Sequence, residues 1–214
     1  MINFAHFVEQ IKSTFKKEQL TIFDSIDCYD SISLASAGHN DVEGYQIFTP
    51  DFIVKDMCSE IGKDVFDSTK TILEPTSGDG AFTTYILQRR LEKIKADFEI
   101  ESLRALSTIY SIEMDKELIE KQRNNIFTLV KIFIVKNKID VDDSYYDILK
   151  CIITTNFLWA MFNSDRDIDM GLLGTEIAYK MPEAEKGKLK PLDMPVWEIS
   201  ETGIKVHEEG VDLW

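Results

Sequence analysis

The fold of this chain is decided by one short stretch, Thr71-Ile72-Leu73-Glu74-Pro75-Thr76-Ser77-Gly78-Asp79-Gly80-Ala81-Phe82. Its first part is an apolar run that ends in a carboxylate, which is typical of a short strand. Two glycines follow within residues 77–80, and glycine permits the backbone angles of a tight turn. From Ala81 to Ile94 the apolar residues have helical spacing. The stretch therefore predicts a strand, a glycine turn and a helix in succession.

A second unit of the same kind follows. The β-branched run from Leu106 to Ile112 closes on Glu113-Met114-Asp115, and residues 116–135 have helical spacing. Strands joined through helices form right-handed βαβ units with parallel strands, so we expect an α/β fold with a Rossmann-like sheet. Residues 146–149 and 151–155 are expected to add a third and a fourth strand, although residues 142–153 are equally compatible with helical turns.

The flanking segments predict further elements. Apolar residues at helical spacing over residues 4–15 predict an N-terminal packing helix, and residues 31–40 predict a loop. Thr49 as N-cap and Pro50 at the first helical position predict a second helix, whose apolar face would hold Phe52, Ile53, Met57 and Ile61. The expected divisions are an N-terminal helical segment at 1–43, a main domain at 44–163, and a C-terminal irregular tail or small hairpin at 164–214.

Composition indicates an ordinary water-soluble chain. A length of 214 residues suffices for one full core, and the hydrophobic share of 44% and charged share of 29% are typical of globular proteins. No apolar run is long enough for a membrane span, and the first residues do not resemble a secretory signal, so a cytoplasmic location is expected. The cysteines and histidines are scattered, so no disulfide framework and no metal site is predicted.

The net charge bears on partners. A formal charge of −14 argues against this chain gripping DNA alone, because affinity for nucleic acid rests largely on lysine and arginine. The acidic balance is explained simply by solubility, or, as a sharper alternative, by a basic partner subunit.

The chemistry is expected where the parallel strands end. Nucleotide-like ligands bind beyond the carboxyl ends of such strands, and Glu74 and Glu113 both fall there. Glu74 would face a positively charged amino-acid moiety, Glu113 would accept hydrogen bonds from ribose hydroxyls, and Met114 would pack on an adenine face. Rival phosphate-binding motifs fit less well: no lysine follows Gly80 as a P-loop requires, and the third glycine of a dinucleotide motif is replaced by Thr83. A tight turn without a ligand is the plain alternative.

These residues resemble a known family, the adenine-N6 DNA methyltransferases in which the cofactor motifs precede the catalytic one. Three stretches are similar to its motifs in the same order, over roughly residues 44–125: residues 46–57, 72–82 and 110–115. The resemblance implies a Rossmann-like methyltransferase sheet that binds S-adenosyl-L-methionine. The cofactor-binding residues that it implies are Phe48, Thr49, Glu74, Pro75, Ser77, Gly78, Gly80, Phe82, Glu113 and Met114.

The catalytic motif departs from the family pattern. The family presents Asp or Asn, two prolines and an aromatic residue, which hold a flipped adenine. This chain has no Pro-Pro pair, and its nearest candidate is Asn156-Phe157-Leu158-Trp159, which makes Asn156 and Trp159 the candidate catalytic residues. In a second alignment, residues 156–163 resemble the motif before the catalytic one, so that the catalytic strand would be missing. In a third interpretation, these aromatics are simply core residues.

Three functions stay open at this point. The first is an adenine-N6 DNA methyltransferase of restriction-modification type, or a cofactor-binding subunit of one, with DNA as the substrate of the complete enzyme. The second is a degenerate methyltransferase that works as a non-catalytic interaction protein. The third is a methyltransferase that acts on RNA or protein.

Overall fold

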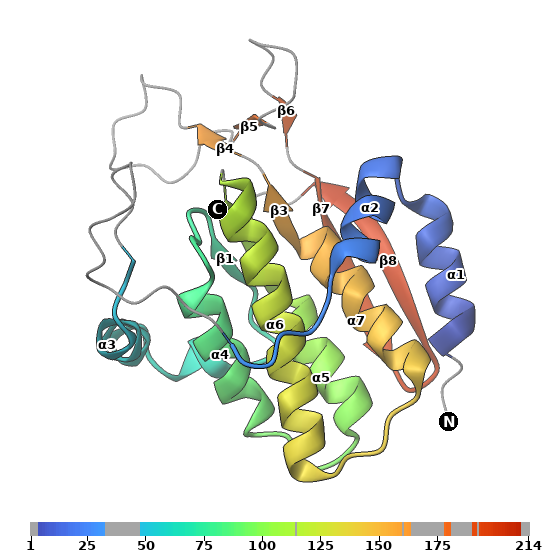
Figure 1. Cartoon of the computed structure of the whole chain (residues 1–214), viewed down its shortest axis with the longest axis horizontal. Coiled ribbons are helices and arrows are strands. Elements are labelled where there is room, and N and C mark those ends of the chain that lie inside the picture. Colours follow the sequence, from blue (N-terminus) through green and yellow to red (C-terminus); the bar gives the residue numbers. More distant parts are fainter. Residues whose placement is uncertain are drawn as a thin grey trace.

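A three-stranded parallel sheet lies at the centre of the chain (Figure 1). The computed structural model describes residues 4–32, 48–113, 115–159, 161–163, 178–180, 190–191 and 193–210. The sheet has the order β1 (Ile72–Glu74), β2 (Ile109–Glu113) and β3 (Phe157–Trp159). Its register pairs Glu74 with Ser111 and Glu113 with Trp159. The predicted mixed α/β architecture with parallel strands is thereby confirmed.

Two helices make each connection within this sheet. Helices α4 (Ala81–Leu91) and α5 (Phe98–Ser107) link β1 to β2, and α6 (Lys116–Asn137) and α7 (Asp143–Asn156) link β2 to β3. The helices predicted at residues 81–94 and 116–135 are confirmed. The strand predicted from Leu106 instead begins at Ile109, because Leu106 belongs to the last turn of α5.

Of the two alternatives for this stretch, the helical one is confirmed: the segments at residues 146–149 and 151–155 form no strands, since both belong to α7. The Asp142 side chain caps this helix and accepts a hydrogen bond from the backbone N–H of Ser144 at 2.7 Å. The helix is buried on most of its circumference, including Tyr145, Ile148 and Cys151. Burial all round conceals the 3.6-residue period, which is why the apolar run is also compatible with strands.

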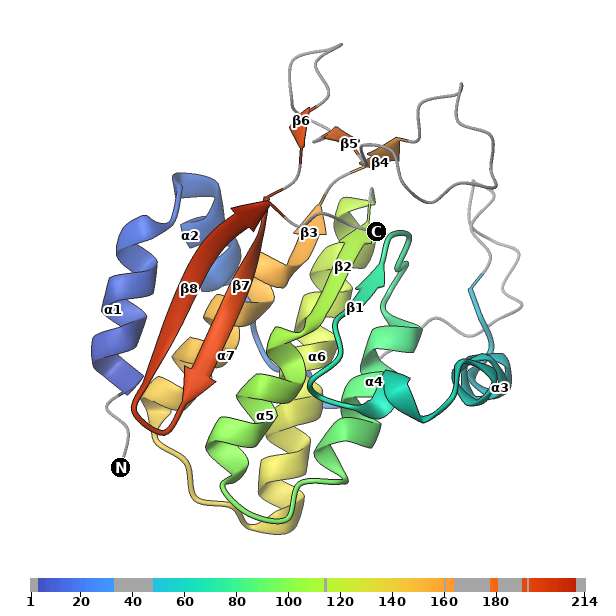
Figure 2. The same cartoon turned by 180° about the vertical axis from the view of Figure 1, so that it is seen from behind.

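Both ends of the described chain pack onto this centre. Helices α1 (Phe4–Thr14) and α2 (Lys17–Ser25) pack against α7. The N-terminal pattern predicts α1 but not α2. Of the two forms expected for the C-terminal segment, the structure contains the hairpin: β7 (Asp193–Ser200) pairs with β8 (Gly203–Gly210), and Figure 2 shows it across α5 and α7. A small antiparallel sheet contains β4 (Met161–Asn163), β5 (Ala178–Lys180) and β6 (Lys190–Pro191).

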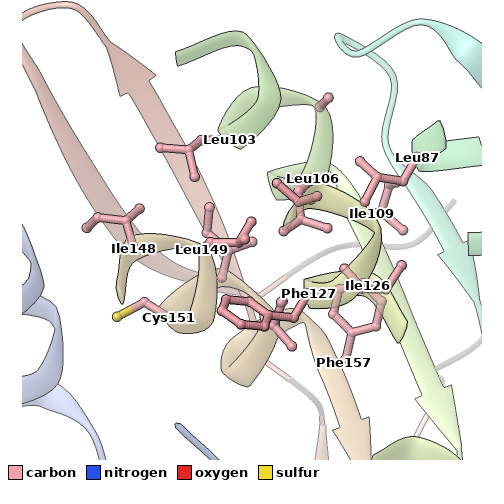
Figure 3. Close-up of a cluster of buried hydrophobic side chains, with 14 of the residues drawn as sticks. Leu87, Leu103, Leu106, Ile109, Ile126, Phe127, Ile148, Leu149, Cys151 and Phe157 are labelled. Carbon is pink, nitrogen blue, oxygen red and sulfur yellow. The ribbon is translucent and has the colours of Figure 1, made fainter. Parts of the chain in front are cut away.

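One hydrophobic core joins these pieces (Figure 3). Leu103 and Leu106 from α5 meet Ile126 from α6 and Ile148 from α7, and all four are buried. Phe4 from α1 packs edge-on against Tyr145, with ring centroids 6.2 Å apart. The N-terminal helices and the C-terminal hairpin therefore share the core of the expected main domain.

Helix α3 (Asp51–Ile61) forms where it is predicted, but the residues assigned to its apolar face are not the ones that it buries. Pro50 occupies the N-cap position without a side-chain hydrogen bond, so Thr49 does not cap the helix. The helix buries Val54 and Cys58, and leaves Phe52, Met57 and Ile61 with exposed fractions of 63%, 49% and 65%. A short 3₁₀ helix, η1 (Lys63–Phe66), follows.

No helix among the described residues combines the length and the apolar character that crossing a membrane requires.

Candidate functional site

The glycine turn joins β1 to α4 in left-handed backbone conformations. Gly78 has a φ of 58° and Gly80 a φ of 84°, which glycine adopts without the steric cost of a side chain. The backbone N–H of Gly80 donates to the carbonyl of Ser77 at 3.0 Å, which closes the turn. Both glycines of the motif are thus required by backbone geometry, as their place after the strand predicts.

Glu113 connects this turn to the end of the neighbouring strand. Its Oε2 accepts a hydrogen bond from the backbone N–H of Gly78 at 2.7 Å, and its Oε1 accepts one from the backbone N–H of Asp115 at 2.8 Å. A carboxylate has about four lone-pair positions, so two remain for hydroxyl groups of a ligand. The two predicted motifs therefore meet in one place, although they lie 35 residues apart in the chain.

Among the acidic residues at the glycine turn, Glu74 has the most strongly shifted pKa. Its Oε2 is buried and has no hydrogen-bond partner among the residues that the structure describes. Burial raises the pKa of Glu74 to about 8; the backbone N–H of Thr83 opposes the rise, and the carboxylates of Asp79 and Glu113 add to it. These mutual effects locate Glu74, Asp79 and Glu113 at one end of the sheet.

The surroundings of the turn favour a cationic ligand over a phosphate. The carboxylates of Asp79 and Glu113 lie beside Glu74, whose pKa of about 8 keeps it protonated at neutral pH. The ammonium group of Lys121 on α6 lies 3.2 Å from Asp79. An anionic group would meet this negative charge, whereas a positive group would offset it and favour ionisation of Glu74. The buried Oε2 of Glu74 offers such a group an acceptor that the described protein atoms leave unused.

Gln122 on α6 organises the turn, and sequence reasoning missed it. Its Oε1 accepts hydrogen bonds from the hydroxyls of Ser77 and Ser111, both at 2.9 Å. Its Nε2 donates to the Thr83 hydroxyl at 2.7 Å, and the side chain is fully buried. The available signal was a polar residue between Ile119 and Ile126 on the apolar face of the helix.

The structure places only some of the other expected cofactor-binding residues at this turn. Pro75 directly follows β1, and Phe82 is partly buried in the first turn of α4. Phe48 and Thr49 immediately precede α3. Within this helix, burial raises the pKa of the Cys58 thiol, and the Glu74 carboxylate adds to the rise. Met114 lies outside the described residues.

The two candidate catalytic residues lie at opposite ends of β3. Trp159 pairs with Glu113 at the carboxyl end, and the ammonium of Lys116 lies 5.3 Å from the centre of its indole ring. It therefore lies at the same edge of the sheet as the glycine turn. Asn156 immediately precedes the strand, at its amino end.

The geometry contradicts the expectation that Asn156 presents its amide to a substrate. Its Nδ2 donates to the carbonyls of Ser107 and Ile109 at 2.9 and 3.1 Å. Its Oδ1 accepts from the Trp197 indole N–H at 3.0 Å, and the residue is fully buried. Asn156 therefore links α5, β2 and the C-terminal hairpin. It lies at the amino ends of the strands, whereas Glu113 lies at a carboxyl end.

Replacing Asn156 with alanine should therefore destabilise the fold. We expect the free energy of unfolding to fall by about 2 kcal/mol, because two buried carbonyls and the Trp197 N–H lose their partner. Urea unfolding followed by circular dichroism measures this loss. The exposed Asn137→Ala variant should unfold like the parent chain. An Asn156→Ala chain of parental stability would refute the structural role.

A cavity lies elsewhere in the molecule. A volume of about 600 Å³ opens between α5, the loop before β1 and the β7–β8 hairpin, with Arg104, Thr108 and Lys205 in its walls. Arg104 anchors the hairpin there, because its Nε–H donates to the carbonyl of Ile199 at 2.8 Å. Among the described residues, no cluster of histidine, cysteine and acidic side chains is arranged to hold a metal ion.

Comparison with known proteins adds no family to this geometry: no family model matches the chain, and neither curated proteins nor solved structures returned a significant match.

Proposed function

We propose that this chain binds S-adenosyl-L-methionine on a Rossmann-like methyltransferase sheet, as the cofactor-binding subunit of an adenine-N6 DNA methyltransferase. The observation that carries the proposal is the hydrogen bond between Glu113 and the backbone N–H of Gly78. This bond brings together the two motifs that resemble the family, at the carboxyl ends of the strands, where such ligands bind.

The residues at this edge fit the parts of that cofactor. Glu113 has acceptor positions left for the ribose hydroxyls, and Glu74 offers a buried carboxylate oxygen to the positively charged methionine end. A Cβ atom added at Gly78 would meet no heavy atom within 4 Å, so this part of the turn has space for a ligand. The bound cofactor would supply a methyl group for transfer to an exocyclic nitrogen.

DNA enters this proposal as the substrate of a completed enzyme. Because the chain carries a formal charge of −14, a basic partner subunit would supply the phosphate contacts. RNA or protein is the alternative substrate class, since the proposed site concerns the cofactor and not the methyl acceptor. A cytoplasmic setting suits each of these substrates.

A specific observation favours a second candidate function, a degenerate methyltransferase that binds a partner without catalysis. The amide of Asn156 is used inside the core, and the chain has no Pro-Pro pair to form the family's catalytic motif. Such a protein would keep the cofactor and lack transfer.

Replacing Glu113 with alanine should weaken cofactor binding by about 1 to 3 kcal/mol, because charge-assisted hydrogen bonds to the ribose are lost. Titration calorimetry with S-adenosylmethionine measures the change. The matched control is Glu117→Ala, which removes an exposed carboxylate from the first turn of α6. Unchanged affinity in the Glu113 variant would remove this residue from the site, and no binding by the parent chain would refute the proposal.

A tritium-methyl transfer assay on unmethylated DNA then separates the two candidate functions. Transfer by the chain alone supports a complete methyltransferase. Transfer that appears only when a basic partner subunit is added identifies the cofactor-binding subunit, and cofactor binding without transfer in the presence of that partner identifies the degenerate protein.

A further inference from the structure

Strand β1 has an open edge. In the part of the chain that the structure describes, β1 pairs with β2 alone. The backbone N–H of Ile72 donates to the carbonyl of Thr108 at 2.8 Å, so the backbone groups of Ile72 and Glu74 face β2. The N–H and carbonyl of Leu73, the residue between them, consequently face the other side. A free N–H and carbonyl on a strand edge are a template for pairing with another chain.

An apolar helix face lies on the same side of the molecule. Both views place α3 beyond β1, on the side away from β2 and β3 (Figures 1 and 2). Met57 and Ile61, four residues apart, lie on one face of this helix and are both exposed. The helix packs against α4 and η1, which follow and precede β1 in the chain. Large apolar side chains grouped on one exposed face indicate an interaction surface.

The charge of this surface selects the kind of partner. Asp51, Asp56, Glu60 and Asp64 are exposed on α3 and η1. Lys55 is paired with Asp51 within the helix, and Lys63 of η1 is also exposed, so four acidic groups face two basic ones on these two helices. Acidic groups around an apolar centre favour a partner with apolar residues flanked by lysine or arginine. A second copy of this chain would bring a charge of −14 against −14, which opposes self-association.

We propose that the Leu73 edge of β1 and the exposed face of α3 form a docking surface for a basic protein segment, which adds to the sheet as a strand beside β1. Backbone hydrogen bonds to Leu73 would set the register, and apolar side chains of the segment would cover Met57 and Ile61. This surface is defined independently of any cofactor. Pro75, which has no N–H, ends the pairing at the carboxyl end of β1, so the added strand is short.

Hydrogen exchange at Leu73 tests the proposal, with a short synthetic peptide of alternating valine and lysine as the probe. In the free chain, the amide hydrogen of Leu73 should exchange with solvent faster than is usual for a residue in a strand. Saturating peptide should slow this exchange about ten-fold or more, because the amide gains a partner. A peptide with glutamate in place of lysine should leave the exchange unchanged.

Substitutions locate the surface. The double variant Met57→Ser, Ile61→Ser should weaken binding of the lysine peptide about ten-fold, because two small polar side chains replace its apolar contact. The control Val135→Ser changes an apolar residue on α6 that is 73% exposed, and it should bind the peptide like the parent chain. A Leu73 amide already protected in the free monomer would overturn the proposal. So would equal binding of both peptides, parental binding by the double variant, or a homodimer that the double variant dissociates.

Discussion

Replacing Gly80 with alanine should lower the free energy of unfolding by about 3 to 4 kcal/mol, the largest loss that we expect from a single methyl group in this chain. Two costs add at this position. The left-handed backbone, with a φ of 84°, is strained for alanine. The new Cβ would also overlap Cγ of Gln122 and lie 2.8 Å from its Cδ, which forces the buried glutamine away from its serine and threonine partners.

Gly78→Ala is the matched control. Its φ of 58° carries the same backbone cost, but no heavy atom lies within 4 Å of the added Cβ. We expect a loss of about 1 kcal/mol. In a Gln122→Ala background, Gly80→Ala should also cost only about 1 kcal/mol, since the clash is gone. Urea unfolding of these variants beside the parent chain provides the test, and equal losses at the two glycines would show that Gln122 does not pack as described.

Replacing Glu74 with glutamine should raise the free energy of unfolding by about 4 kcal/mol at pH 8. In the folded chain the pKa of Glu74 is raised from 4.5 to about 8, by burial first and then by Asp79 and Glu113. Between these pH values the folded chain keeps a proton that the unfolded chain has released. Stability from this group is therefore fully present below pH 4.5, and it is lost as the pH rises to about 8.

Thermal unfolding at a series of pH values measures this difference. The gain from Glu74→Gln should vanish near pH 4 and grow steadily up to about pH 8. The control Glu117→Gln removes an exposed carboxylate and should follow the parent chain at every pH. A Glu74→Gln variant that is no more stable than the parent at about pH 8 would show that Glu74 is ionised in the folded protein at little cost.

Local patterns in the sequence predict the elements whose signal is complete within a few residues. Gly78 and Gly80 follow an apolar run that ends in Glu74, and the structure contains the strand, turn and helix in that order. Glu113 likewise follows a β-branched run and ends β2. Parallel strands bring their carboxyl ends to one edge, so the meeting of the two motifs was also predictable.

Long-range packing decides what the patterns leave open. The run over residues 146–155 is apolar on nearly every side, and contact with α1, α2, α5 and α6 makes it a helix. Asn156 and Trp159 belong to the same four-residue motif, yet they lie at opposite ends of β3. At the amino end, Asn156 is hydrogen-bonded to Ser107, Ile109 and Trp197.

The sequence by itself determined the α/β character, the glycine turn and the two strand-end carboxylates, because each depends on the residue types of a short segment. Only the tertiary structure decided that Gln122 holds the turn, that Asn156 belongs to the core and that α3 turns Met57 and Ile61 outward. The physical reason is that burial and hydrogen-bond partners are set by segments distant in the chain, which no local pattern contains.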